Sequence, residues 1–136
     1  MSKSIPKSAK IILLNLLILL PLLYLLAPQK QLARARNFAR EYGLAKIRSA
    51  LMVYRAPDHE GHLPQSIAAQ CPEMQVIGSI NVDLEYELRN YFFKNFPYDP
   101  LSGTKENTGY KICLNGEKIF LEADKAELGK KIVLGE

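Results

Sequence analysis

The hydrophobic pattern of the chain begins with one long apolar run. Residues 11–27, IILLNLLILLPLLYLLA, carry no charge and only one strongly polar side chain, Asn15. A helix of about 17 residues rises roughly 26 Å, close to the ~30 Å hydrocarbon thickness of a bilayer. The aliphatic stems of Lys10 and Lys30 extend that reach. The pattern predicts a transmembrane helix over 11–27, preceded by a short basic tail over 1–10.

A cleaved secretory signal is the alternative interpretation of this segment, because lysines precede the apolar run. The run is longer than the usual signal core of about 7–15 residues. Pro28 would also directly follow Ala27, the small residue at which cleavage would occur. The sequence therefore favours an uncleaved anchor.

Residues 28–56 show an apolar stripe at helical spacing. In this stripe Leu44, Ile47, Leu51 and Tyr54 recur at three- and four-residue steps, with Phe38 and Tyr42 one and two turns earlier on a neighbouring face. The cationic residues Arg40, Lys46, Arg48 and Arg55 fall mostly off it. Ala, Leu and Arg, which are strong helix formers, are frequent here. We expect an amphipathic stem that continues the membrane helix, with Pro21 and Pro28 as kink points and the stripe as a packing surface.

Residues 57–136 read as a small α+β head. Turn residues fill 57–66, and an irregular link covers 66–80. A short helix is expected over 81–96, with Asn81 or Asp83 as its cap and prolines at its end. Asn115-Gly116 between two apolar runs predicts a hairpin whose central residues both take positive φ. Residues 130–135 could add a third strand, and the stem should cover the sheet.

Charge is divided unevenly between the two halves of the chain. Residues 1–55 contain ten Lys/Arg and one acid, a balance of +9, whereas residues 56–136 contain eight and thirteen, a balance of −5, which together give +4. The basic stem suits anionic lipid headgroups. Nucleic acid is the weaker interpretation, since no recognition motif accompanies the basic residues. Counting Lys and Arg beside the span alone would place the C-terminus in the cytoplasm.

Cys71 and Cys113 are the two cysteines of the chain. With an extracytoplasmic head, they could form a disulfide, which would contribute about 3–4 kcal/mol in the chain-entropy model. Two buried, unpaired thiols are the open alternative.

Metal and catalytic chemistry have little support in the sequence. His59 and His62, with Asp58, Glu60 and Cys71 nearby, suggest zinc, but no second ligand pair follows and a solvated turn is preferred. The chain lacks G-x-S-x-G, H-E-x-x-H and a phosphate-binding glycine loop. No third group is available to orient a Cys71–histidine pair. Asp99, Ser102 and Gly103 read as a turn. We therefore expect no enzymatic activity.

Three segments resemble type IV pilin-like proteins, with a layout similar to the major pseudopilin of type II secretion. The first is ARNFAREYGLAKIRSALMVYRAPDHEGHLP, in which Gly61 and Pro64 match the family and Leu63 replaces an aromatic residue. The second is LRNYFFKNFPYDPLSG, which has Pro97, Asp99, Pro100 and Gly103 in place. The third is the hairpin. The resemblance implies a pilin-like fold and a single-pass protein of the bacterial inner membrane with an extracytoplasmic head, of the kind that can be incorporated in a pilus or pseudopilus.

The N-terminus departs from that family. Aligning Pro28 with the family's proline puts the first mature residue at Lys7, the leader glycine at Pro6 and the conserved glutamate at Ile11. Peptidase processing and membership of a long polymer are therefore both in question. The family also binds calcium near its C-terminus. Asp124 and Glu127 lie roughly in place, but lysines flank them, so calcium is the weaker expectation and no other cofactor is expected.

The sequence thus predicts a non-enzymatic structural subunit that is anchored in the membrane. It would assemble with other pilin-like subunits or a membrane complex, as a homo- or hetero-oligomer, through its N-terminal helix, where Asn15 could hydrogen-bond to a neighbouring helix. The alternative is a membrane-anchored accessory module that binds a protein partner or serves DNA uptake and never enters a filament.

Overall fold

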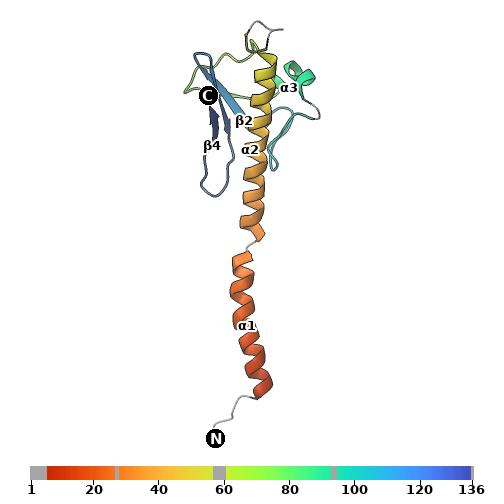
Figure 1. The fold of residues 1–136 in the computed structure, drawn as a ribbon, viewed down its shortest axis with the longest axis vertical. Coiled ribbons are helices and arrows are strands. Elements are labelled where there is room, and N and C mark those ends of the chain that lie inside the picture. The colour runs from red at the N-terminus through yellow and green to blue at the C-terminus, as the bar shows by residue number, and fades with distance from the viewer. Residues whose placement is uncertain (1–5, 27, 57–60, 93–94, 136) are drawn as a thin grey trace. The chain divides into compact units, whose positions relative to one another are not determined.

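The computed structural model describes residues 6–26, 28–56, 61–92 and 95–135. The chain divides into two compact units, residues 1–32 and residues 33–136, which are described separately. Most of the predicted stem therefore belongs to the same unit as the head. Together they form the expected α+β arrangement of a long N-terminal helix and a small antiparallel sheet (Figure 1).

The first unit contains helix α1, Lys7–Leu26, in which Pro21 lies inside the helix. Its described leucines and isoleucines are between 52% and 67% exposed. Near the N-terminus, the described residues include one helix that is long and apolar enough to cross a membrane, with an 18-residue window of mean hydropathy 2.1. The expected continuity with the stem depends on Ala27, which lies outside the described residues.

Helix α2 spans Pro28–Tyr54, so the predicted stem helix is confirmed over most of its length. Pro28 is its first residue. Proline is well tolerated there because the N–H of the first helical residue has no partner within the helix. Within α2, Pro28 therefore costs no hydrogen bond.

The sheet has four antiparallel strands in the order β1-β2-β3-β4. These strands are β1 Gln75–Val76, β2 Tyr110–Asn115, β3 Lys118–Ala123 and β4 Ile132–Gly135. The hairpin and the third strand predicted from the sequence are both present, whereas β1 was not predicted. Its two residues pair with Lys111 and Ile112 of β2 and have no periodicity of their own.

The hairpin turn differs from the prediction by one residue. Asn115 is the last residue of β2 and pairs with Lys118, so the central turn residues are Gly116 and Glu117. Gly116 has φ of +61°, while Glu117 is not among the residues with positive φ. This matches a type II′ turn, in which only the first central residue needs a positive φ.

The predicted short helix is present in two pieces, α3 Leu84–Glu87 and the 3₁₀ helix η2 Arg89–Tyr91. The side chain of Asp83 accepts a hydrogen bond from the Tyr86 N–H at 3.1 Å, so Asp83 is the cap and Asn81 is not. Leu84 and Leu88 are fully buried. This helical segment therefore packs into the same core as the sheet.

The core of the second unit lies where α2 packs along one face of the sheet (Figure 1). Leu44, Ile47 and Leu51 of the predicted stripe are fully buried there. Burying each such side chain stabilises the fold by about 1.5–3 kcal/mol. Their partners from the sheet are Tyr110, Ile112, Ile119, Leu121, Ala123 and Ile132.

Candidate functional site

The face of α2 that meets the sheet contains an arginine that is completely buried. Arg40 has 0% exposure, although we predicted it to lie off the apolar stripe with the other cations. That prediction is wrong. Position 40 is four residues before Leu44 and therefore on the same side of the helix, in phase with Ile47 and Leu51. Periodicity alone indicated this placement, but the charge argued against it.

Two carboxylates surround the Arg40 guanidinium. Its Nε donates to Asp99 Oδ2 at 2.5 Å, and its Nη1 donates to Glu127 Oε2 at 2.8 Å. Nη1 also donates to the Asn37 side-chain oxygen at 2.9 Å. A buried charge is tolerated when it is paired and hydrogen-bonded in this way. Arg40 therefore links α2 to two loops that are distant in sequence.

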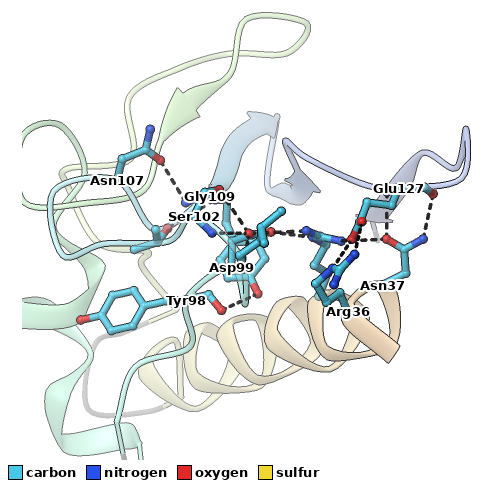
Figure 2. Close-up of polar contacts among 12 residues, drawn as sticks. Arg36, Asn37, Tyr98, Asp99, Ser102, Asn107, Gly109 and Glu127 are labelled. Carbon is cyan, nitrogen blue, oxygen red and sulfur yellow. Dashed lines mark hydrogen bonds and ion pairs between the residues drawn. The ribbon is translucent and has the colours of Figure 1, made fainter. Parts of the chain in front are cut away.

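Glu127, in the connection between β3 and β4, is the second centre of this network. Arg36 donates to both of its carboxylate oxygens, at 2.7 and 2.6 Å. Asn37 also bonds to the backbone of Glu127 in both directions, donating to its carbonyl at 2.8 Å and accepting from its N–H at 2.9 Å (Figure 2). One turn of α2 thus holds the tip of the β3–β4 connection.

Electrostatics in the network favour the charged form of every member. Hydrogen bonds from Arg36, and then from Arg40, lower the pKa of Glu127 to about 2. Burial acts to raise the pKa of Asp99, but the bonds from Arg40 and from backbone N–H groups outweigh it and lower that pKa. Burial likewise opposes the charge of Arg40, yet its bonds to Asp99 and Glu127 leave its pKa raised. The network is therefore ionic at neutral pH.

Asp99 of the segment YDPLSG also organises its own turn. One carboxylate oxygen accepts hydrogen bonds from the N–H groups of Leu101 and Ser102, both at 2.9 Å. The Ser102 hydroxyl donates to the same oxygen at 3.2 Å. The turn predicted here is confirmed, but its buried ion pair with Arg40 was not predicted from the sequence. Gly109 (φ +80°) fits closely against it, because an added Cβ would lie 2.5 Å from the Asp99 Cβ.

The other residues of the predicted turn motif surround this aspartate. Gly103 donates its N–H to the Asp99 carbonyl at 3.0 Å, and an added Cβ at Gly103 would lie 2.7 Å from the Tyr98 Cβ. Pro97 is half-buried, while Pro100 is exposed. The motif is therefore a compact turn that presents Asp99 to the helix.

The face of α2 opposite the core carries an exposed stripe, which we call the outer stripe. It comprises Phe38, Tyr42, Ala45, Ser49 and Val53. Phe38 is 70% exposed and Tyr42 is 62% exposed, so these two predicted packing residues make no core contact, whereas Tyr54 is half-buried. Apolar side chains therefore occur on both faces of this helix, and those of the outer stripe are exposed.

A groove of about 550 Å³ lies beside the outer stripe. It runs from Tyr42 and Val53 of α2 to Tyr91 and Phe92 at the end of η2. The Lys46 ammonium lies over the Tyr42 and Phe92 rings, 5.9 Å from each centroid. These cation–π contacts hold the lysine stem along the groove wall.

The structure contains the disulfide between Cys71 and Cys113, one of the two alternatives that the sequence left open. The two Cα atoms are 5.2 Å apart across a sequence separation of 42 residues. The bridge fastens the link that precedes β1 to strand β2. Beside it, the Cys71 N–H donates a hydrogen bond to the Leu114 carbonyl at 2.7 Å.

The residues considered for metal binding do not converge on a site within the described part of the chain. No group of three or more His, Cys, Asp or Glu side chains that could hold a metal occurs there. His62 is exposed, and His59, Asp58 and Glu60 lie outside the described residues. Asp124 forms an ion pair with Lys111, and the Glu127 carboxylate forms ion pairs with Arg36 and Arg40. The carboxylate oxygens of Glu127, which a calcium ion would need, are thus bound by guanidinium groups.

Of the proposed helix-contact positions in the first unit, Asn15 and Pro21 are exposed on α1. Ile11 lies within α1, but its side chain is not described.

Comparisons with protein-family models, with curated proteins and with solved structures found no match for this chain. The resemblance to pilin-like proteins therefore remains a prediction from the sequence segments.

Proposed function

We propose that this chain is a non-enzymatic structural subunit, pilin-like in layout, anchored in the bacterial inner membrane by its N-terminal helix. In this proposal the head is extracytoplasmic, and the chain assembles with partner subunits or a membrane complex through α1 and α2. The disulfide supports this side of the membrane, because such bridges persist in oxidising compartments.

The observation that carries the proposal is the outer stripe of α2. The sheet already buries the inner face of the same helix. Phe38 and Tyr42 lie on the other face, are exposed, and are therefore not needed for the core of the head. The middle of the stripe is small, with Ala45 and Ser49 between the aromatic residues and Val53. Small residues between larger ones let a second helix approach closely, as in helix–helix packing within membranes.

The decisive experiment is site-specific photo-cross-linking in native membranes. A benzophenone amino acid at Phe38 or Tyr42 should give adducts with a helix of a partner subunit or of a second copy. The matched control is the same amino acid at Ala39, which is exposed on α2 but outside the outer stripe. Equal adduct yields at all three positions, or no adduct at Phe38 and Tyr42, would contradict assembly through this face.

A further inference from the structure

The outer edge of the sheet is open. Strand β4 pairs with β3 on one side, and no described residue pairs with it on the other. The register determines which backbone groups this edge exposes. The Asp124 N–H donates to the Gly109 carbonyl at 3.0 Å, so the even-numbered residues of β3 bond toward β2 and the odd-numbered residues toward β4.

The same alternation continues into β4. Leu121 is opposite Leu134 and Ala123 is opposite Ile132, so Ile132 and Leu134 exchange hydrogen bonds with β3. The N–H and C=O of Val133 therefore point away from the sheet. A strand placed beside β4 would meet a donor and an acceptor there without displacing any existing bond.

A groove runs between this edge and α2. Its first part, about 570 Å³, is lined by Glu41 and Leu44 of the helix and by residues 130–134. Its second part, about 450 Å³, shares Leu134 and continues along Ala45, Arg48 and Met52. An added strand could therefore bond to β4 while alternate side chains cover the helix, as in strand-addition complexes.

The charged residues along this edge indicate what kind of segment it could bind. The head as a whole is acidic, but Lys130 and Lys131 are both exposed at the start of β4, where the Lys131 ammonium lies 3.5 Å from the Glu122 carboxylate. The nearby Glu127 carboxylate is already paired with Arg36 and Arg40. Among the described residues, Glu41 is the one acidic residue that lines either part of the groove. The basic residues that line it are Arg48, Lys130 and Lys131. An acidic segment complements this surface.

A second copy of the chain fits the edge poorly. Strand β4 runs in the same direction as α2, because Glu127 lies beside Arg36 and Leu134 beside Met52. Antiparallel pairing of two β4 edges would place the N-termini of the two α2 helices, each of which follows its proposed anchor by one residue, at opposite ends of the pair. Parallel pairing would bring the Lys130 and Lys131 residues of both copies to the same end of the strand pair, and like charges close together destabilise such a pair.

We propose that the β4 edge and the groove beside it bind an extended segment of a different protein, with apolar residues alternating with Asp or Glu. The exclusion of a second copy rests on the membrane anchoring in the proposed function. The site includes the β4 edge, which the outer stripe lacks, although its second part shares Ala45, Ser49 and Val53 with that stripe.

The test uses the full-length chain in native membranes with a benzophenone amino acid at Glu41. Proteolysis and mass spectrometry should map the adduct to an acid-bearing segment of another polypeptide. Val133→Pro removes the outward N–H and should lower the adduct yield about tenfold, whereas Val133→Ala keeps the N–H and should preserve it. Lys130→Glu combined with Lys131→Glu should lower the yield at least as much.

Several outcomes would overturn this inference. These are no adduct at Glu41, an adduct with lipid or with a second copy of the chain, and a yield that Val133→Pro leaves unchanged. Loss of the chain from the membrane fraction would instead contradict the proposed function. The two failures are therefore distinguishable in one preparation.

Discussion

At the residue scale, the ion pairs of Arg40 are the strongest constraint on the head. An arginine with 0% exposure needs both of its carboxylate partners, and those partners come from two different loops. Sequence periodicity placed Leu44, Ile47 and Leu51 correctly, but it could not pair position 40 with Asp99, 59 residues away. Such a pairing forms only in the folded tertiary structure, and no local sequence pattern predicts it.

Replacing Arg40 should therefore destabilise the head strongly. We expect Arg40→Met to lower the free energy of unfolding by about 3–5 kcal/mol, because it leaves the Asp99 carboxylate buried without its counterion. Urea unfolding in detergent, followed by circular dichroism, measures this. Arg34→Met is the control, since Arg34 is exposed on the same helix and should change stability by less than about 0.5 kcal/mol. Equal effects of the two substitutions would refute the account of the network.

Stability should fall in acid because of Asp99 and Glu127. Their pKa values are lower in the folded state, so the unfolded state takes up protons first and stability drops as pH decreases. For Glu127 the loss should extend from around its ordinary pKa of 4.5 down to about 2. Melting temperatures between pH 6 and pH 2 measure it. Glu127→Gln should flatten part of this dependence, and an identical profile for the variant would contradict the assignment.

Leu128, beside Glu127, has φ of +60° and is 50% exposed. A bulky side chain is strained in that conformation, whereas asparagine tolerates it. We expect Leu128→Asn to stabilise the head by about 0.5–1 kcal/mol in the same urea assay. Leu101→Asn is the control, because Leu101 is also an exposed loop leucine but has negative φ. Destabilisation by Leu128→Asn would show that the leucine makes contacts that outweigh the strain.

At the element scale, the sequence predicted α1, α2, β2, β3 and β4, because long periodic runs and a glycine turn specify them locally. It missed β1, a two-residue strand whose pairing with β2 follows from the disulfide and from the Gln75 side chain. The Gln75 carbonyl oxygen accepts from the N–H groups of Ala68 and Ala69 at 2.9 and 2.8 Å. It also placed Phe38 and Tyr42 on a face next to the core stripe, whereas both are exposed on the opposite face of α2, because spacing alone does not say which apolar face meets the sheet.

The register of β4 gives a test of its open edge. Val133→Pro should change the free energy of unfolding by less than about 1 kcal/mol, because the N–H of Val133 makes no bond within the sheet. Leu134→Pro should cost at least about 2 kcal/mol, because it removes a bond to β3. Urea unfolding of the two variants measures the difference. If both were equally destabilised, the assignment of the outward-facing groups would be wrong.

At the scale of the whole molecule, an apolar helix and a folded head form separate units, and each has a surface that the chain itself leaves uncovered. On α1 the exposed leucines need lipid or neighbouring helices, because water is a poor environment for so large an apolar area. On the head, the outer stripe and the β4 edge offer two further contacts. The function in membrane assembly proposed above would account for these surfaces together.

The most direct test of this account is alkaline carbonate extraction of native membranes, followed by intact mass measurement of the chain. We predict that the polypeptide stays in the membrane pellet with residues 11–27 present, and that Leu16→Lys with Leu19→Lys weakens its retention. Recovery of the chain in the soluble fraction with residues 11–27 intact would contradict the central claim.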